Sequence, residues 1–329
     1  MNSVVDKMNP PIFILSQPRA GSTMLQRILG GHPEVHTLSE PTFLLHPCYG
    51  LKESGGWAEY EEGNWAFEAT NEFLRQVGGR DVYVRAVRRM AEVIYEAALA
   101  GSGKVCFLDK TPRYYFIINE LAEVFPDARF IILVRNPLAV LCSIVRTWVH
   151  GDWGNLRSYR GDLLKAPGLI AEGMERLGGR AVVVRYEDLV QRPSEEVKRI
   201  CEAVGLAFHE EMLVYGRSEQ SFRFGDDTGV LRHDRPDAGH NDRWIEDIGD
   251  TSVWRLASDY LAYLGKDTMG RLGYDFAETE RTLAARRPGP AARLFSIPLS
   301  FRLAGQGPIG AAKWLARSCT ARRGGRTHS

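Results

Sequence analysis

This sequence lacks long apolar runs and paired cysteines. No stretch of the 329-residue chain approaches the ~20 apolar residues that a membrane-spanning helix needs. The five cysteines include no C-x-x-C pair, a pattern typical of free thiols in a reducing compartment and unfavourable to structural zinc. The N-terminal apolar segment is too short for a secretory signal, and no small-residue cleavage site follows it. These absences predict a cytoplasmic protein.

Lysine and net charge are also scarce. The chain has 8 Lys against 34 Arg, a usage that fits a GC-rich bacterial genome, and its 42 basic residues nearly cancel 41 acidic ones, for a net charge of +1. So balanced a composition argues against a nucleic-acid partner. Residues 281–329 nevertheless carry ten basic residues and no Asp or Glu, which leaves residues 1–280 with a net charge of −9. The charge pattern predicts a domain over 1–280 and a basic, proline-containing C-terminal tail over 281–329.

The tail interleaves arginines with apolar residues such as Phe295, Phe301 and Trp314. A basic and apolar segment of this kind can dock on anionic lipid, which would make the protein peripheral to the inner face of the membrane. Four prolines interrupt the segment, so a solvated and partly disordered extension is the alternative. Both hypotheses remain open.

Short continuous apolar runs alternate with helical stretches along the first 264 residues. Apolar runs predict buried strands over Ile12–Ser16, Lys104–Leu108, Arg129–Val134 and Arg180–Tyr186. Helices are predicted over residues 22–29, 82–100, 113–125, 138–149, 193–204 and 251–264. This alternation favours an α/β fold of three layers, with a central parallel sheet flanked by helices. Residues 44–80 are predicted to be irregular, and residues 216–243 a long functional loop.

The first predicted strand leads into a glycine-containing turn, Gln17–Thr23, and then into a helix. A helix N-terminus presents backbone N–H groups and partial positive charge, and so favours an anion. Gly21 allows close backbone approach, Ser22 and Thr23 supply hydroxyls, and Arg19 supplies a charged fork; Ser22 is also predicted to cap the helix. The pattern G-x-x-x-x-G-K-[ST] is absent, which disfavours an NTPase. An ordinary strand–helix turn is the alternative interpretation.

A second anion-suited loop follows the strand predicted over Arg129–Val134. Arg135 stands at the carboxyl end of that strand, where open α/β sheets bind ligands. Ser143 comes eight residues later, about two helical turns on and on roughly the same face. The two side chains could hold one phosphate between them. A surface ion pair between Arg135 and a carboxylate is the alternative.

Together these loops resemble those of the PAPS-dependent sulfotransferases, closest to the tyrosylprotein sulfotransferase branch and its bacterial relatives; PAPS is 3′-phosphoadenosine 5′-phosphosulfate. PRAGST (18–23) is similar to the family's 5′-phosphosulfate loop, and RNPLAVLCS (135–143) to its 3′-phosphate segment. Further similar stretches, in the family's order, are LQRILGGHPEVHTLSE (25–40), LDKTP (108–112), RYEDLVQRP (185–193), GHNDRW (239–244) and LGYDF (272–276). The resemblance covers about residues 11–276.

The resemblance implies a P-loop-like fold and an enzyme that moves a sulfuryl group from PAPS to an acceptor hydroxyl, leaving 3′,5′-ADP. It gives Glu40 the role of general base, and it makes Arg19 and Lys110 the cations that stabilise the transferred group and the leaving phosphate. No metal is required, because cationic side chains supply the positive charge.

The resemblance also implies the nucleotide-binding residues. The 5′ side would be held by Arg19, Ala20, Gly21, Ser22 and Thr23, and the 3′-phosphate by Arg135 and Ser143. Tyr186 would pack near the nucleotide, Thr228 would support the transition state, and Arg243 would reach a phosphate.

The sequence departs from the family at two places. Ser39-Glu40-Pro41-Thr42 stands where the tyrosylprotein branch has Glu-Glu-Thr-Arg, and Thr147 stands where the family has a phosphate-contacting arginine. The first departure bears on the acceptor rather than the donor. We expect a hydroxyl on a small molecule, lipid or sugar as the acceptor, because a peptide tyrosine fits poorly with a cytoplasmic protein.

Aromatic residues between 43 and 67, among them Phe43, Tyr49, Trp57 and Trp65, would line the acceptor pocket or simply pack in the core. Two other functions stay open. One is a P-loop-type kinase of a small molecule, and the other is a non-catalytic nucleotide-binding protein of the same fold. The sequence does not fix the oligomeric state.

Overall fold

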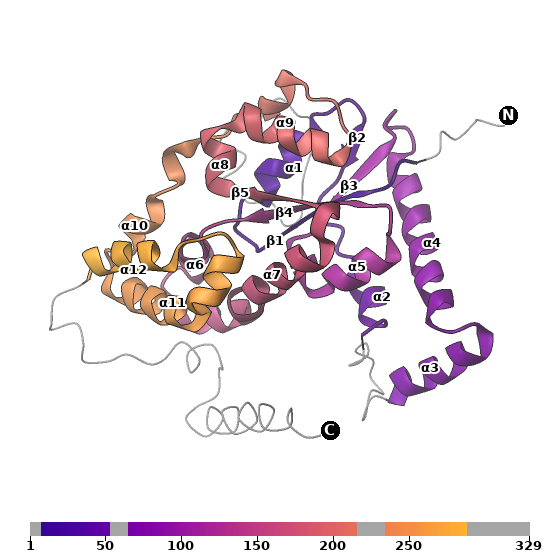
Figure 1. Cartoon of the computed structure of the whole chain (residues 1–329), viewed down its shortest axis with the longest axis horizontal. Helices are drawn as coiled ribbons and strands as arrows, with labels where there is room; N and C mark the ends of the chain where they lie inside the picture. The colour runs from indigo at the N-terminus through magenta and orange to yellow at the C-terminus, as the bar shows by residue number, and fades with distance from the viewer. Residues whose placement is uncertain (1–7, 53–64, 216–233, 288–329) are drawn as a thin grey trace. The chain divides into compact units, whose positions relative to one another are not determined.

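A parallel sheet forms the centre of the chain in the computed structural model, which describes residues 8–52, 65–215 and 234–287 (Figure 1). Among these residues the sheet has five strands in the order β2-β3-β1-β4-β5, and each neighbouring pair is parallel. The strands are β1 (Ile12–Ser16), β2 (Val35–Thr37), β3 (Cys106–Lys110), β4 (Arg129–Val134) and β5 (Ala181–Arg185). The predicted α/β class with a central parallel sheet is confirmed.

The described residues divide into two compact units. The first runs through Arg135 and resumes over Leu169–Ala238, and it contains the sheet; the second comprises Asn136–Gly168 and the chain from Gly239. Helices of the first unit are α1 (Ser22–Gly30), α2 (Leu45–Tyr49), α3 (Trp65–Val77), α4 (Arg80–Leu99), η2 (Pro112–Ile117), α5 (Ile118–Val124), η6 (Gly178–Arg180), α8 (Tyr186–Gln191), α9 (Pro193–Val204) and η7 (Glu210–Leu213).

In the described part of the second unit, all the regular secondary structure is helical. Its helices are α6 (Pro137–Ile144), η3 (Val145–Val149), η4 (Trp153–Tyr159), η5 (Gly161–Lys165), α10 (Arg243–Asp247), α11 (Thr251–Arg271) and α12 (Phe276–Ala285). Two further helices, α7 (Ala166–Leu177) and η10 (Ala238–His240), span the points where the chain passes between units. Asp250 and Asp275 cap α11 and α12 by accepting from first-turn backbone N–H groups.

Both faces of the sheet are covered within the first unit, which explains why the central strands read as continuous apolar runs. On one face, side chains of β1, β3, β4 and β5 form a buried cluster with those of α1, α8 and α9, including Leu25, Leu189 and Ile200. On the other face, the ring of Phe13 packs against Phe125 at 5.2 Å. Figure 1 shows α1, α8 and α9 on one side of the sheet and α4 and α5 on the other.

Several predicted elements lie where the sequence placed them, namely β1, β4 and α9. Strand β3 begins two residues later than predicted and includes Lys110, which the sequence suggested as part of a loop. Strand β2 and helix α7 were not predicted, and α2 and α3 lie in the region expected to be irregular. Ser22 does not cap α1: it is the first helical residue, and Gly21 occupies the capping position.

The predicted division at residue 280 stays a prediction. Residues 288–329 of the predicted tail, and Thr228 of the predicted loop, lie outside the described residues. Across the described ranges, no helix is both long enough and apolar enough to cross a membrane.

Candidate active site

The loop between β1 and α1 has the shape expected of an anion site. The Ala20 N–H donates to the Gln17 carbonyl at 3.1 Å, which closes a turn at the end of β1. Arg19 and Gly21 both take left-handed backbone conformations, with φ of 71° and 99°. Gly21 precedes α1 and has no side chain to cap it, so the first N–H groups of the helix are directed at whatever occupies the loop.

The ring of Tyr186 packs directly against Gly21 of this loop. A Cβ on Gly21 would lie 2.5 Å from Tyr186 Cδ2, so the glycine is required by the close approach as well as by its φ. The guanidinium carbon of Arg135 lies 4.1 Å from the centroid of the Tyr186 ring, in range of a cation–π interaction. Burial raises the pKa of the Tyr186 phenol, and the charge of Arg135 opposes that shift.

Arg135 also contacts the first loop. Its Nη1 donates to the backbone carbonyl of Arg19 at 3.1 Å. The two loops that the sequence marked as anion-suited are therefore joined: Arg135, at the end of β4, links the ring of Tyr186 to the backbone of the β1–α1 loop. Sequence reasoning placed these residues in separate motifs and did not predict this contact.

A buried ion pair lies at the end of β3. Lys110 Nζ donates to Glu40 Oε1 at 2.7 Å, and it also donates to Thr23 Oγ1 on α1 at 3.4 Å. The Lys110 side chain is 0% exposed and that of Glu40 is 18% exposed. Charges this far from water require close partners. The structure thus brings together two of the predicted catalytic residues and one predicted binding residue.

Three other predicted residues lie outside the described part of the first unit. Ser143 lies on α6 and is buried, and Arg243 is the exposed first residue of α10; both belong to the second unit. Thr228 lies outside the described residues. Their assignment to the nucleotide stays a prediction.

The aromatic residues predicted to line an acceptor pocket lie in different environments. Phe43 packs its ring edge-on against Tyr95, with centroids 5.5 Å apart. Trp65 is 66% exposed on α3, and Trp57 lies outside the described residues. These positions do not identify an acceptor, so the predicted aromatic lining of an acceptor pocket stays a prediction. No group of three or more His, Cys, Asp or Glu suited to a metal occurs in the described ranges.

A parallel sheet, a loop with a glycine of positive φ that leads into a helix N-terminus, and a buried lysine at the carboxyl end of β3 are together typical of an anion-binding protein. Comparison with known proteins narrows that class. A family model described as "Sulfotransferase family" matches residues 10–210, and the chain belongs to this family. The predicted family is confirmed.

The chain is also similar to individual proteins. The chain is 29% identical over 292 residues to nodulation protein NoeE of Sinorhizobium fredii, a match that covers 80% of this chain and 65% of NoeE. It is 26% identical over 212 residues to the protein-tyrosine sulfotransferase of Drosophila melanogaster, covering 62% of this chain and 40% of that protein. A solved sulfotransferase domain from the Synechococcus PCC 7002 olefin synthase has a TM-score of 0.49 at 25% identity, covering 74% of this chain and 90% of the domain. The match spans about two thirds of the length of NoeE and less than half of the length of the Drosophila protein.

Proposed function

We propose that this protein transfers a sulfuryl group from PAPS to the hydroxyl of a small molecule, lipid or sugar. The single observation that carries the proposal is the buried Lys110–Glu40 pair beside Thr23, at the N-terminal end of α1. A cation, a hydroxyl, a helix N-terminus and a carboxylate meet there, and these are the groups that such a transfer needs.

The residues present fit the donor. A phosphosulfate is a compact anion, and the β1–α1 loop offers it backbone N–H groups, the Ser22 and Thr23 hydroxyls and the charges of Arg19 and Lys110. Lys110 is fully buried, so its charge is poorly screened and acts strongly on an anion next to it. In the proposed complex Arg135 and Ser143 take the 3′-phosphate, and Tyr186 and Arg243 contribute to the nucleotide site.

The donor supplies an activated sulfuryl group with a phosphate as leaving group. The acceptor oxygen forms a bond to sulfur as the bond from sulfur to the 5′-phosphate oxygen breaks. Glu40 takes the proton of the acceptor hydroxyl, a contribution of ~10²–10⁴-fold for a general base. Lys110 and Arg19 stabilise the negative charge that develops on the leaving oxygen, and a preorganised donor of this kind is worth about 10²–10³-fold.

A protein tyrosine is the second candidate acceptor. It is favoured by the relatives that carry the name protein-tyrosine sulfotransferase. The first proposal is preferred because Ser39, Pro41 and Thr42 depart from the Glu-Glu-Thr-Arg segment that the resemblance implies for the tyrosylprotein branch.

Transfer from ³⁵S-labelled PAPS tests the proposal. The full chain is incubated with labelled PAPS and with lipid, saccharide, small-molecule and protein fractions of a cell extract, with γ-³²P-ATP in a parallel set. We expect ³⁵S in a non-protein fraction and no ³²P transfer. Label in the protein fraction would favour the tyrosine acceptor, ³²P transfer would favour a kinase, and nucleotide binding with no transfer to any fraction would favour a non-catalytic protein.

We also propose a cytoplasmic location, with the tail of residues 281–329 in contact with anionic membranes. Co-sedimentation with vesicles of phosphatidylglycerol and phosphatidylcholine tests the contact. The full chain should sediment, and a variant with Arg293, Arg302, Arg317 and Arg322 changed to Gln should stay in the supernatant. Equal sedimentation of both proteins would refute the membrane contact.

A further inference from the structure

Asp109 is a buried carboxylate that the proposed chemistry does not use. It precedes Lys110 in β3 and is 0% exposed. Its oxygens accept from Tyr95 Oη at 2.6 Å, from Thr111 Oγ1 at 3.1 Å and from Tyr114 Oη at 3.3 Å. Burial raises the pKa of Asp109 to about 6, against the hydrogen bonds of the three hydroxyls. Burial of a carboxylate is unfavourable, and residues with perturbed pKa values are often found at functional sites.

Two of these three hydroxyls also bind the segment that carries Glu40. The backbone N–H of Thr42 donates to Thr111 Oγ1 at 3.3 Å, and that of Leu44 donates to Tyr114 Oη at 3.3 Å. Each hydroxyl accepts from the segment and donates to Asp109. The carboxylate thus orients both hydroxyls, because an acceptor-only group can take nothing but their protons.

The backbone of this segment is under strain. Thr42 has a φ of 57°, in the left-handed region that a β-branched residue rarely adopts. Strained conformations persist where surrounding contacts hold them, and they gather at functional sites. The Thr42 N–H is one of the two groups that Thr111 and Tyr114 hold.

The other side of Glu40 is tied to α1. Gln26 Nε2 donates to the Leu38 carbonyl at 2.6 Å and to Thr37 Oγ1 at 2.8 Å. Thr37 Oγ1 in turn donates to the Leu108 carbonyl of β3 at 2.8 Å. Hydrogen bonds therefore hold the backbone on both sides of Glu40, at residues 38, 42 and 44. We call this set of contacts the bracket.

We propose that Asp109, acting through Thr111 and Tyr114, is a positioning residue that holds Glu40 at its contact with Lys110. Successive residues of a strand point to opposite faces, so β3 uses Lys110 to bind the Glu40 carboxylate directly and Asp109 to fix the backbone that follows it. The catalytic meaning of this arrangement rests on the proposed function. The existence of the bracket does not rest on the proposed function.

The expected effect is on turnover rather than on donor binding. A catalytic group misplaced by about 1 Å costs about 10²-fold in rate. Loss of the Thr111 or Tyr114 hydroxyl frees one end of the Glu40 segment, while the β1–α1 loop and its nucleotide contacts keep their own support from Tyr186 and Arg135.

The test uses three full-length variants: Thr111→Val, Tyr114→Phe and Tyr95→Phe. Tyr95→Phe is the matched control, because it removes the shortest hydrogen bond to Asp109 and keeps the ring that packs on Phe43. Amide hydrogen exchange of Thr42 and Leu44 is measured by NMR, with 3′,5′-ADP affinity by calorimetry and initial rates of transfer from PAPS.

We expect exchange of the Thr42 amide in Thr111→Val, and of the Leu44 amide in Tyr114→Phe, to accelerate by about tenfold, the equivalent of one hydrogen bond. Both variants should lose about 10-fold to 10²-fold in kcat with KM for PAPS unchanged. Tyr95→Phe should show neither effect. The same loss of kcat in Tyr95→Phe, or unchanged exchange and unchanged kcat in the other two, would overturn the proposal.

The exchange measurement keeps this proposal separate from the proposed function. If the wild-type chain transfers nothing from PAPS, the proposed function fails, and unaccelerated exchange in Thr111→Val and Tyr114→Phe would still refute the bracket. If the wild-type chain is active and the exchange rates rise without a loss of kcat, the bracket exists and its catalytic role is refuted.

Discussion

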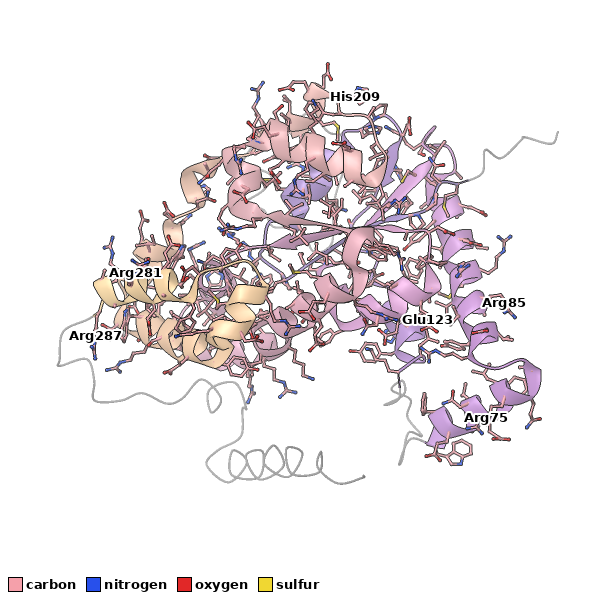
Figure 2. All side chains as sticks on the ribbon, viewed as in Figure 1. Arg75, Arg85, Glu123, His209, Arg281 and Arg287 are labelled. Carbon is pink, nitrogen blue, oxygen red and sulfur yellow. The ribbon has the colours of Figure 1, made fainter. Side chains whose placement is uncertain are left out.

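The first unit holds charged side chains in two contrasting settings. At the end of β3 the Lys110–Glu40 pair is nearly sealed from water, with side-chain exposures of 0% and 18%. On α3 the pair Arg75–Glu72 is 69% and 62% exposed, and on α4 Arg89–Glu92 is 71% and 31% exposed. Figure 2 shows Arg75 and Arg85 on these two helices, directed away from the sheet.

The contrast extends to the apolar side chains. Trp65, Phe73 and Val93 of α3 and α4 are more than half exposed, and α3 has no buried residue. The polar groups beside the active site, in contrast, are buried and matched to one another. Water screens the ion pairs on α3 and α4, so removal of one partner there costs little stability. The difference teaches that burial among matched partners, not charge alone, distinguishes the proposed catalytic residues of this unit.

The largest expected effect is that of Glu40→Gln. The amide keeps an acceptor for Lys110 but cannot take a proton at neutral pH, so transfer should fall by at least ~10²-fold while 3′,5′-ADP still binds. Transfer rates and calorimetry measure the two quantities, and Glu72→Gln on α3 is the matched exposed control. Near-normal turnover in Glu40→Gln would remove this residue as the base.

Gly21→Ala should destabilise both the fold and the nucleotide site. The new Cβ would lie 2.5 Å from Tyr186, at a φ of 99°. The two effects together should lower the free energy of unfolding by about 1–3 kcal/mol, measured by urea denaturation. Gly270→Ala on α11 is the control, because its Cβ would meet nothing within 4 Å and helix propensity favours alanine. Equal stability of the two variants would contradict the close approach.

Arg135→Ala or Ser143→Ala should weaken 3′,5′-ADP by about tenfold or more and 5′-AMP much less, because a hydrogen bond to a charged group is worth about 1.5–3 kcal/mol. Calorimetry with both nucleotides measures the difference. In Arg135→Ala some loss is expected for both, because Arg135 also supports the backbone of Arg19. Equal losses for both nucleotides in both variants would rule out the 3′-phosphate assignment.

Asp109→Asn should change how stability depends on pH. The folded pKa of about 6 lies above the usual carboxyl value of about 4, so the folded state binds this proton more tightly than the unfolded chain does. The stabilisation is fully present below about pH 4 and is lost as pH rises through about 6. Urea unfolding should show wild type losing stability relative to Asp109→Asn over this range. A constant difference would contradict the raised pKa.

Arg75→Ala should have the smallest effect. Its partner Glu72 is three residues earlier on an exposed helix, and pairs of this kind contribute about 0.2–1 kcal/mol or less. We expect a change within about 0.5 kcal/mol by urea denaturation and unaltered nucleotide affinity. A loss of stability comparable to that of Gly21→Ala would show that α3 contributes more to the fold than its exposure indicates.

The sequence predicted best where burial acts on a whole element. Strands β1 and β4 are apolar except for Ser16 and Arg129, because both faces of the sheet are covered. Helix α9 begins with Pro193 and has two acidic residues in its first turn. Strand β2, Val35–Thr37, is too short to show a periodicity. The predicted range of β3 ended two residues too early because Asp109 and Lys110 are charged residues typical of loops. Only their hydrogen-bond partners explain why they lie in a strand.

The site was predicted by motif and not by contact. Sequence similarity singled out Glu40, Lys110 and Arg19, yet nothing local states that Lys110 binds Glu40 or that Arg135 reaches the Arg19 carbonyl. The sequence predicted no role for Asp109, which is one residue of the LDKTP stretch. A charged residue directly after the apolar run VCFL was the available signal, since buried carboxylates need partners.

Binding of 3′,5′-ADP, 5′-AMP and ATP to the full-length chain, measured side by side by calorimetry, tests the central claim most directly. A PAPS site built from the β1–α1 loop and Arg135 predicts that 3′,5′-ADP binds at least about tenfold more tightly than 5′-AMP, and also more tightly than ATP, which has no 3′-phosphate. ATP binding more tightly than 3′,5′-ADP, or no preference for the 3′-phosphate, would contradict it.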